Sequence, residues 1–193
     1  MNKRVFIVAS ALETGIINDI NGSPVIYSGI GKINATMAAY KAFTDGYTEV
    51  INIGSCGSLK HEQGTIINVG LVYQDIDGTP LCEYGITPFE HTRNIVVNRL
   101  SDLTCFTTDY FVDLSQIDKY SPSYINMINR CDAFDMESYA IAKVCSQKDV
   151  NFICYKYITD YVGSNSVSMW EENCHKGAKF FVEKIDDHFK NTI

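Results

Sequence analysis

The sequence predicts an α/β fold: a single domain, residues 1–193, built around a sheet that is buried on both faces. Segments typical of strands and of helices alternate along the chain. Several of the strand segments are continuous apolar runs, which is typical of strands covered on both sides. The chain has 193 residues, 46% of them hydrophobic and 20% charged, enough for one domain with a full core. We see no internal repeat, low-complexity tract or linker.

The expected elements follow from apolar runs and from helical spacing. The run at residues 5–8 is too short for a signal peptide, so we interpret it as a first strand. Further strands are expected at residues 26–28, 50–53, 66–73, 103–106, 133–134 and 152–158. Helices are expected at residues 32–43, with Ile33, Met37, Tyr40 and Phe43 at helical spacing, at 137–147, and at 167–189, with Trp170, Phe181, Ile185 and Phe189 on its inner side. Residues 74–129 are irregular and too long for one idle loop, so we expect them to carry part of the site.

Charge and cysteine usage exclude several classes of protein. The net charge is -7 and the basic residues are scattered, which argues against a nucleic-acid surface. No apolar run approaches the roughly 18 residues of a membrane span. The seven cysteines are odd in number and none forms a CxxC pair, which favours reduced thiols in a cytoplasmic protein over disulfides or zinc ligands.

Polar, glycine-rich or acidic residues follow four of the expected strands. In open α/β sheets, ligands bind beyond the carboxyl ends of the strands, so these four segments mark the candidate site. They are residues 29–32 (GIGK), 54–57 (GSCG), 135–137 (DME) and 159–160 (TD).

The first two segments each allow more than one interpretation. The GIGK segment suits a phosphate cradle or a tight strand-to-helix turn, but it lacks P-loop spacing, and Asn34 replaces the third glycine of GxGxxG. In GSCG, Cys56 occupies the place of the serine in a GxSxG elbow, and none of the four histidines has a pattern that marks a base. Contact with a ligand through Ser55 and the backbone is therefore favoured over a nucleophile.

The two acidic segments also have structural explanations. Asp135 and Glu137 open a helix, where acids serve as caps, or one of them accepts hydrogen bonds from vicinal sugar hydroxyls. Asp160 ends a strongly apolar strand, where it is either a turn residue or an acid placed for proton transfer.

Taken together, the four segments resemble the purine nucleoside phosphorylase and nucleosidase superfamily, and within it the methylthioadenosine/S-adenosylhomocysteine nucleosidases. The similarity is carried, in order, by residues 28–35 (SGIGKINA), 50–59 (VINIGSCGSL), 134–142 (FDMESYAIA) and 152–160 (FICYKYITD). The resemblance implies a nucleoside phosphorylase-like fold: a twisted mixed central sheet, partly barrel-like, flanked by helices.

The resemblance also implies catalytic roles. Asp160 would protonate or hydrogen-bond N7 of the leaving purine, with Thr159 beside it as a further substrate contact, and Glu137 would hold the ribose 2′- and 3′-hydroxyls. Cleavage of the glycosidic bond leaves an oxocarbenium-like sugar and negative charge on the base, which an acid with a raised pKa neutralises. Such chemistry needs neither a metal nor an organic cofactor.

The same resemblance implies the residues that hold the substrate, a purine nucleoside. Met136 would pack on the sugar, and Ile30 and Ser55 would line the pocket. Residues 107–112 (TTDYFV) match the segment that stacks an aromatic ring on the base, which makes Phe111 the stacking candidate.

Four departures from the family pattern shape the hypothesis. Phosphorylases hold phosphate with arginines, but Asn52 precedes the glycine-serine segment and residues 10–15 contain no arginine, so hydrolysis is favoured. The water-activating glutamate of the nucleosidases falls on Gly15, and Glu13 lies two residues earlier. Either Glu13 substitutes, or the loop is shifted, or water is activated otherwise, or the activity is weak. Lys156 replaces an arginine, and the segments at 15–26 and 73–104 are short.

Four hypotheses therefore stand. The leading one is a purine nucleosidase that uses water. The others are a phosphate-dependent phosphorylase of the same fold, a nucleoside-binding protein without chemistry, and an unrelated α/β protein in which every motif is a cap or turn. By analogy with the family we also expect a role in purine salvage and a homo-oligomer, in particular a homodimer.

Overall fold

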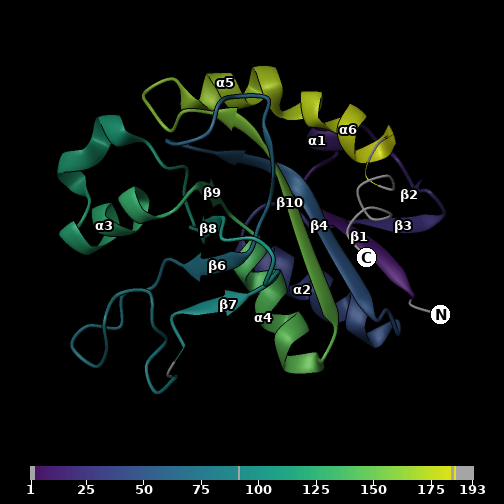
Figure 1. Cartoon of the computed structure of the whole chain (residues 1–193), viewed down its shortest axis with the longest axis horizontal. Coiled ribbons are helices and arrows are strands. Elements are labelled where there is room, and N and C mark those ends of the chain that lie inside the picture. The colour runs from purple at the N-terminus through teal and green to yellow at the C-terminus, as the bar shows by residue number, and fades with distance from the viewer. Residues whose placement is uncertain (1–2, 91, 184, 186–193) are drawn as a thin grey trace.

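The computed structural model describes residues 3–90, 92–183 and 185, and it has a central sheet with helices on both faces (Figure 1). The strands are β1 (Arg4–Val8), β2 (Asp19–Ile20), β3 (Ser23–Tyr27), β4 (Glu49–Gly57), β5 (Ile66–Asn68), β6 (Leu71–Gln74), β7 (Asn94–Val96), β8 (Thr104–Thr107), β9 (Ala133–Asp135) and β10 (Asn151–Asp160). The α-helices are α1 (Ala11–Thr14), α2 (Lys32–Thr44), α3 (Pro122–Arg130), α4 (Ser138–Lys148), α5 (Ser166–Asn173) and α6 (Ala178–Glu183). Short 3₁₀ turns cover Leu114–Lys119 and Cys174–Gly177.

The sheet is mixed, as predicted, and is organised around β4. Its strand order is β2-β3-β1-β4-β9-β8-β6-β7, with β10 pairing with both β4 and β5. The pairs of β1, β4 and β10 are parallel, whereas β10 and β5 are antiparallel. One antiparallel bridge, between Gly57 and Phe134, joins β4 to β9 and leads into the smaller half of the sheet.

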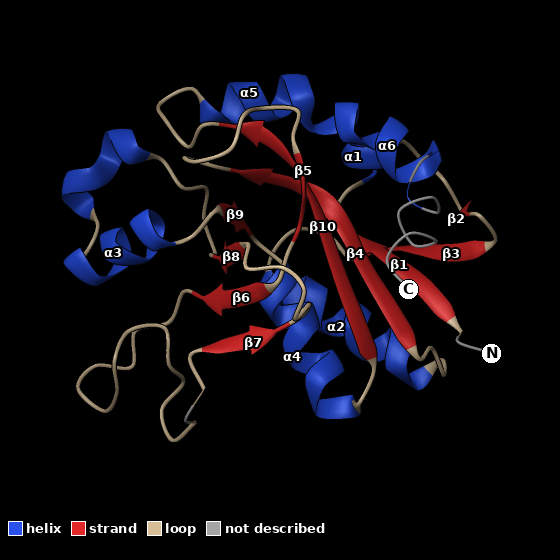
Figure 2. Ribbon diagram, viewed as in Figure 1, coloured by secondary structure: helices blue, strands red, loops and turns tan. Residues whose placement is uncertain are grey.

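Both faces of the sheet are buried, which confirms the prediction from the apolar runs. Side chains alternate across a strand, so Val5 and Ile7 pack in the cluster under α2 and α4, whereas Phe6 and Val8 pack in the cluster that includes Phe181 of α6. Figure 2 shows α2 and α4 together on one side of the sheet and α1, α5 and α6 on the other.

Helix α2 presents its large apolar residues outward. Its buried residues are all alanines, Ala35, Ala38, Ala39 and Ala42. The apolar spacing that predicted this helix instead marks an exposed face, on which Ile33 is 82%, Met37 66% and Tyr40 48% exposed. An exposed apolar stripe of this kind is typical of an interaction surface.

Two predicted elements are divided. The strand expected at 66–73 is two strands with different partners, since β5 pairs with β10 whereas β6 pairs with β7 and β8. Gly70 lies between them, and a Cβ there would lie 1.7 Å from the carbonyl oxygen of Ser101. The helix expected at 167–189 is α5, a 3₁₀ turn and α6, with Ile185 buried; Phe189, like His91 and His188, lies outside the described residues. Every helix in the described part of the chain is too short or too polar to cross a bilayer. All seven cysteines are free thiols.

Candidate active site

A cavity lies at the carboxyl ends of the strands, where the four segments were expected to meet. The space between its walls, open solvent included, is about 560 Å³. Strands β1, β4, β8, β9 and β10 all end at its wall. The lining residues are Ala9, Ser10, Glu13, Ile30, Ser55, Cys56, Gly57, Thr108, Tyr110, Phe111, Val112, Phe134, Asp135, Met136, Glu137, Asp160, Val162 and Trp170.

The cavity brings together all but one of the predicted site residues. Those present are Glu13, Ile30, Ser55, Phe111, Met136, Glu137 and Asp160. Thr159 is the exception: it is fully buried outside the lining, and its hydroxyl donates to the carbonyl oxygen of Cys56 at 3.1 Å. The prediction that Thr159 contacts the ligand is therefore not supported by its position, because side chains alternate along β10 and Thr159 faces away from the neighbouring Asp160.

Asp160 is aimed into the cavity by a local irregularity in β10. The register with β4 shifts between Ile158 and Asp160, a bulge that places Asp160 opposite Gly57. A Cβ on Gly57 would lie 2.8 Å from Oδ1 of Asp160, so only glycine leaves room for this carboxyl group. Oδ1 is buried and has no hydrogen-bond partner among the described residues. Burial raises the pKa of Asp160 to about 6, although a hydrogen bond from the backbone N–H of Val162 opposes the shift.

Glu137 can point into the cavity because Asp135, and not Glu137, caps helix α4. Oδ2 of Asp135 accepts the backbone N–H of Ser138 at 2.9 Å, whereas Glu137, at the N-cap position of α4, makes no side-chain cap. Instead, Oε1 of Glu137 accepts the N–H of Gly31 at 2.9 Å. Burial, followed by the charge of Asp135, raises the pKa of Glu137 to about 7, while Lys156 and the Gly31 N–H pull it down.

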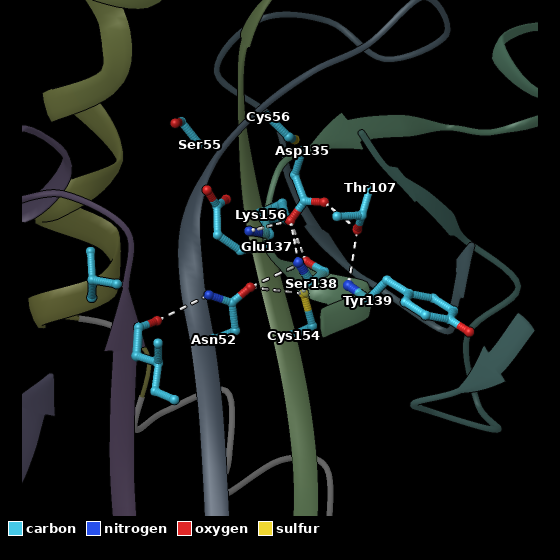
Figure 3. Close-up of polar contacts among 12 residues, drawn as sticks. Asn52, Ser55, Cys56, Thr107, Asp135, Glu137, Ser138, Tyr139, Cys154 and Lys156 are labelled. Atoms are coloured by element: carbon cyan, nitrogen blue, oxygen red, sulfur yellow. Dashed lines mark hydrogen bonds and ion pairs between the residues drawn. The ribbon is translucent and has the colours of Figure 1, made fainter. Parts of the chain in front are cut away.

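Asp135 and Lys156 form a buried ion pair beneath the cavity (Figure 3). Nζ of Lys156 lies 2.8 Å from Oδ2 of Asp135, and the same carboxylate accepts hydrogen bonds from Thr107 and Ser138. Burial alone would raise the pKa of Asp135, but the charge of Lys156 and these hydrogen bonds outweigh it and lower the pKa. Burial likewise opposes the charge on Lys156, and Asp135 overcomes it to hold the lysine pKa well above its ordinary value. The positive charge of Lys156 is thus balanced by Asp135, and Lys156 does not line the cavity.

Glu13, rather than residue 15, reaches the cavity. Its Oε1 accepts the backbone N–H of Ser55 at 2.6 Å and the Ser55 hydroxyl at 2.5 Å. Its Oε2 accepts the N–H of Ser10 at 3.3 Å, which completes a capping box for α1. A Cβ on Gly54 would lie 3.0 Å from Oε1, so the glycine in β4 makes room for the acid. Gly15 is absent from the lining.

The glycine-serine segment, expected to follow the strand at residues 50–53, is instead the end of that strand, β4. Cys56 lines the cavity but is only 4% exposed, and burial raises the pKa of its thiol well above the ordinary value. A thiol held in its neutral form is a poor nucleophile. The position of Cys56 therefore agrees with the preference for ligand contact.

Two contributions were underestimated from the sequence. The irregular middle of the chain supplies Thr108, Tyr110 and Val112 in addition to Phe111, which was the only one of these four named as a candidate. Trp170 lines the cavity from α5, with its ring edge-on to Phe111 at a centroid distance of 6.0 Å. The sequence signal for Trp170 was its apolar spacing, which also suits a core position.

The charged residues of the described chain that line the cavity are all acidic. Four acids line it, Glu13, Asp135, Glu137 and Asp160, and no arginine or lysine of the described chain does. Such a lining disfavours a phosphate anion and suits a ligand that offers hydroxyl groups and a protonatable base.

Known proteins share this architecture: the chain has the fold of the purine nucleoside phosphorylase and nucleosidase superfamily, and the resemblance stated from its motifs is confirmed. No protein-family model matches it. Within the superfamily, the chain is similar to the 5′-methylthioadenosine/S-adenosylhomocysteine nucleosidase of Geobacillus sp. (strain WCH70), with 29% identity over 86% of this chain and 80% of that protein.

Solved structures share the fold over nearly the whole chain. The nucleosidase of the same name from Helicobacter pylori, with butyl-thio-DADMe-Immucillin-A, has a TM-score of 0.82 at 18% identity and covers 99% of both chains. Futalosine hydrolase of Helicobacter pylori strain 26695 has a TM-score of 0.81 at 16% identity and covers 98% of both chains.

Proposed function

We propose that this chain hydrolyses the N-glycosidic bond of a purine nucleoside of the methylthioadenosine or S-adenosylhomocysteine type and releases the free base. The observation that carries the proposal is the buried, unpartnered Oδ1 of Asp160 in a cavity lined by acids and by no arginine or lysine of the described chain. The similarity to nucleosidases of that name supports the substrate class.

Asp160 acts as the proton donor to the leaving base. As the glycosidic bond breaks, its electron pair moves onto the purine, and a proton delivered at N7 neutralises that charge. The raised pKa, about 6, keeps a fraction of Asp160 protonated near neutral pH. Phe111, half exposed in the cavity wall, offers the ring on which the purine stacks.

Glu137 binds the sugar. An ionised carboxylate accepts hydrogen bonds from both the 2′- and the 3′-hydroxyl, and these bonds strengthen as positive charge develops on the ribosyl ring. Met136, beside it in the lining, packs on the sugar. The ion pair beneath, between Asp135 and Lys156, anchors the start of α4 from which Glu137 projects.

Glu13 activates the water that attacks C1′. It takes the proton of the water as the C–O bond forms, and Asp160 supplies the proton that leaves with the base, so the net reaction consumes one water. The presence of Glu13 in the cavity favours an enzyme over a nucleoside-binding protein without chemistry. The absence of arginine and lysine from the described lining favours water over phosphate as the acceptor. The mechanism requires no metal or organic cofactor.

The expected homodimer is also a proposal, supported by the exposed side of α2. We define the α2 apolar face as Ile30, Ile33, Met37 and Tyr40, of which Ile30 also lines the cavity and is 49% exposed. A second copy seated on this face would cover apolar surface continuous with the mouth of the cavity. A cytoplasmic location and a role in purine salvage remain predictions.

The direct test is chromatographic detection of free base. The purified protein is incubated with methylthioadenosine, S-adenosylhomocysteine, adenosine and inosine, each with and without phosphate. We expect adenine release from the first two substrates without phosphate, and a loss of about 10²-fold or more in Asp160→Asn, which keeps the shape but not the acid. Release only with phosphate would assign a phosphorylase, and no release would contradict an enzymatic role.

A further inference from the structure

Trp170 makes a polar contact for which the proposed mechanism has no use. It is the only tryptophan in the chain, and it is half-buried in the cavity wall on α5. Its ring meets Phe111 edge-on, while its indole Nε1 donates to Oγ of Ser55 at 2.8 Å. Trp170 thus contacts both Phe111, the proposed stacking residue, and Ser55, which hydrogen-bonds Glu13.

The indole fixes the direction of the Ser55 hydroxyl. An indole N–H donates and never accepts, so Oγ of Ser55 is the acceptor in this bond. The hydroxyl has a single proton, and Oε1 of Glu13 lies 2.5 Å from Oγ on the other side. The proton of Ser55 is therefore directed to Glu13, and the hydrogen bonds run in one sense from Trp170 through Ser55 to the carboxylate.

This directed chain leaves the two oxygens of Glu13 in different states. Oε1 accepts both the N–H and the hydroxyl of Ser55, at 2.6 and 2.5 Å. Within the described part of the chain, Oε2 accepts only the longer bond from the Ser10 N–H, at 3.3 Å. Oε2 is consequently the oxygen with capacity to take a proton from water.

We infer that Trp170 is a positioning residue: its indole N–H orients the Ser55 hydroxyl and thereby holds Glu13 with Oε2 directed to the attacking water. The inference rests on the proposed function and deepens it. Without the indole donor, the Ser55 hydroxyl is free to rotate away from Glu13, and the carboxylate loses one of the two bonds that hold Oε1.

The test is a double-mutant cycle on base release by the full chain, with methylthioadenosine as substrate. Trp170→Phe keeps an aromatic ring against Phe111 but removes the N–H, and Ser55→Ala removes the hydroxyl through which the indole acts. We expect kcat to fall about tenfold in Trp170→Phe with KM changed less than about twofold. The double variant has the kcat of Ser55→Ala, because the two residues act as one unit.

The matched control is Val167→Ala, on the exposed side of the same helix, which we expect to leave kcat and KM unchanged. Unchanged kcat in Trp170→Phe, additive losses in the double variant, or a rise in KM alone would each overturn the inference, the last by assigning Trp170 to ligand binding. No turnover by the wild type would overturn the proposed function and this inference with it, so the two failures are distinguishable.

A second measurement covers the case in which Trp170→Phe does not fold. Because Trp170 is the only tryptophan, tryptophan fluorescence reports the surroundings of this one side chain, its contact with Ser55 included. Ser55→Thr keeps a hydroxyl and Ser55→Ala does not, so we expect the emission maximum and kcat to be retained in the first and both to change in the second. A change in kcat without a change in emission would overturn the inference.

Discussion

At the scale of single residues, Asp160 and Glu137 need opposite protonation states, and the surroundings of each carboxyl group differ accordingly. Asp160 has an oxygen without a hydrogen-bond partner among the described residues and must hold its proton. Glu137 accepts an N–H and must lose its proton to bind two hydroxyls. Burial raises both pKa values, to about 6 for Asp160 and about 7 for Glu137. Activity therefore depends on both titrations near neutral pH.

The pH dependence follows from the signs of these roles. As pH rises through about 6, Asp160 loses the proton that it donates, and kcat/KM falls. As pH drops below about 7, Glu137 gains a proton and binds the ribose less well, so kcat/KM also falls on the acid side. We expect a narrow bell with its maximum between these values, measured with subsaturating methylthioadenosine.

The control for this profile is Glu137→Gln, which cannot ionise. Its lower kcat/KM retains the fall on the alkaline side and loses the fall on the acid side. A flat wild-type profile across this range would contradict the assignment of both carboxyl groups.

At the scale of elements, the contact between the ends of β4 and β10 positions the proton donor. The bulge in β10 turns Asp160 toward β4, and Gly57 leaves the space that its carboxyl group occupies. Elsewhere in β4, Gly54 does the same for Glu13. The glycines act within a strand as sites of close approach rather than as loop residues.

Gly57→Ala tests this placement. Its Cβ would meet Val162 at 2.6 Å and Asp160 at 2.8 Å, so the carboxyl group must move. We expect kcat/KM for base release to fall about 10²-fold, because a shift of about 1 Å at the reacting centre has that effect. Gly163→Ala is the matched control, since its Cβ would have nothing within 4 Å. Equal activity in the two variants would show that the close approach at Gly57 does not matter.

The sequence alone predicted some residues of the site and missed others. Polar residues at strand ends identified Asp160, Glu137 and Ser55, because the carboxyl ends of parallel strands converge on one edge. Thr159 was expected to contact the substrate beside Asp160, but it is fully buried outside the lining, because side chains alternate across a strand. Trp170 was assigned to the core, because its contact with Ser55 depends on how α5 packs over β4, a tertiary relation.

At the scale of the whole molecule, the α2 apolar face is an exposed surface that a second copy of the chain would cover in the proposed homodimer. The alanines of α2 pack in the core, and its larger apolar residues face outward. Periodicity alone predicted the helix but not which side is buried, because both sides carry apolar residues. The proposed homodimer accounts for the outward set.

Met37→Asp tests the homodimer. A charge placed in an apolar interface costs several kcal/mol, so we expect size-exclusion chromatography with light scattering to show a dimer for the wild type and a monomer for the variant. Ile117→Asp, an equal change at an exposed apolar residue outside this face, is expected to remain a dimer. A monomeric wild type, or a dimeric Met37→Asp, would contradict this assignment of the interface.

Water is the proposed acceptor in this acid-lined cavity. The most direct measurement of that role is whether the oxygen atom of water enters the sugar product. The protein is incubated with methylthioadenosine in oxygen-18 water, with and without phosphate, and the sugar product is analysed by mass spectrometry. We predict one oxygen-18 atom in the released sugar and the same rate under both conditions. An unlabelled sugar phosphate, formed only when phosphate is present, would contradict hydrolysis.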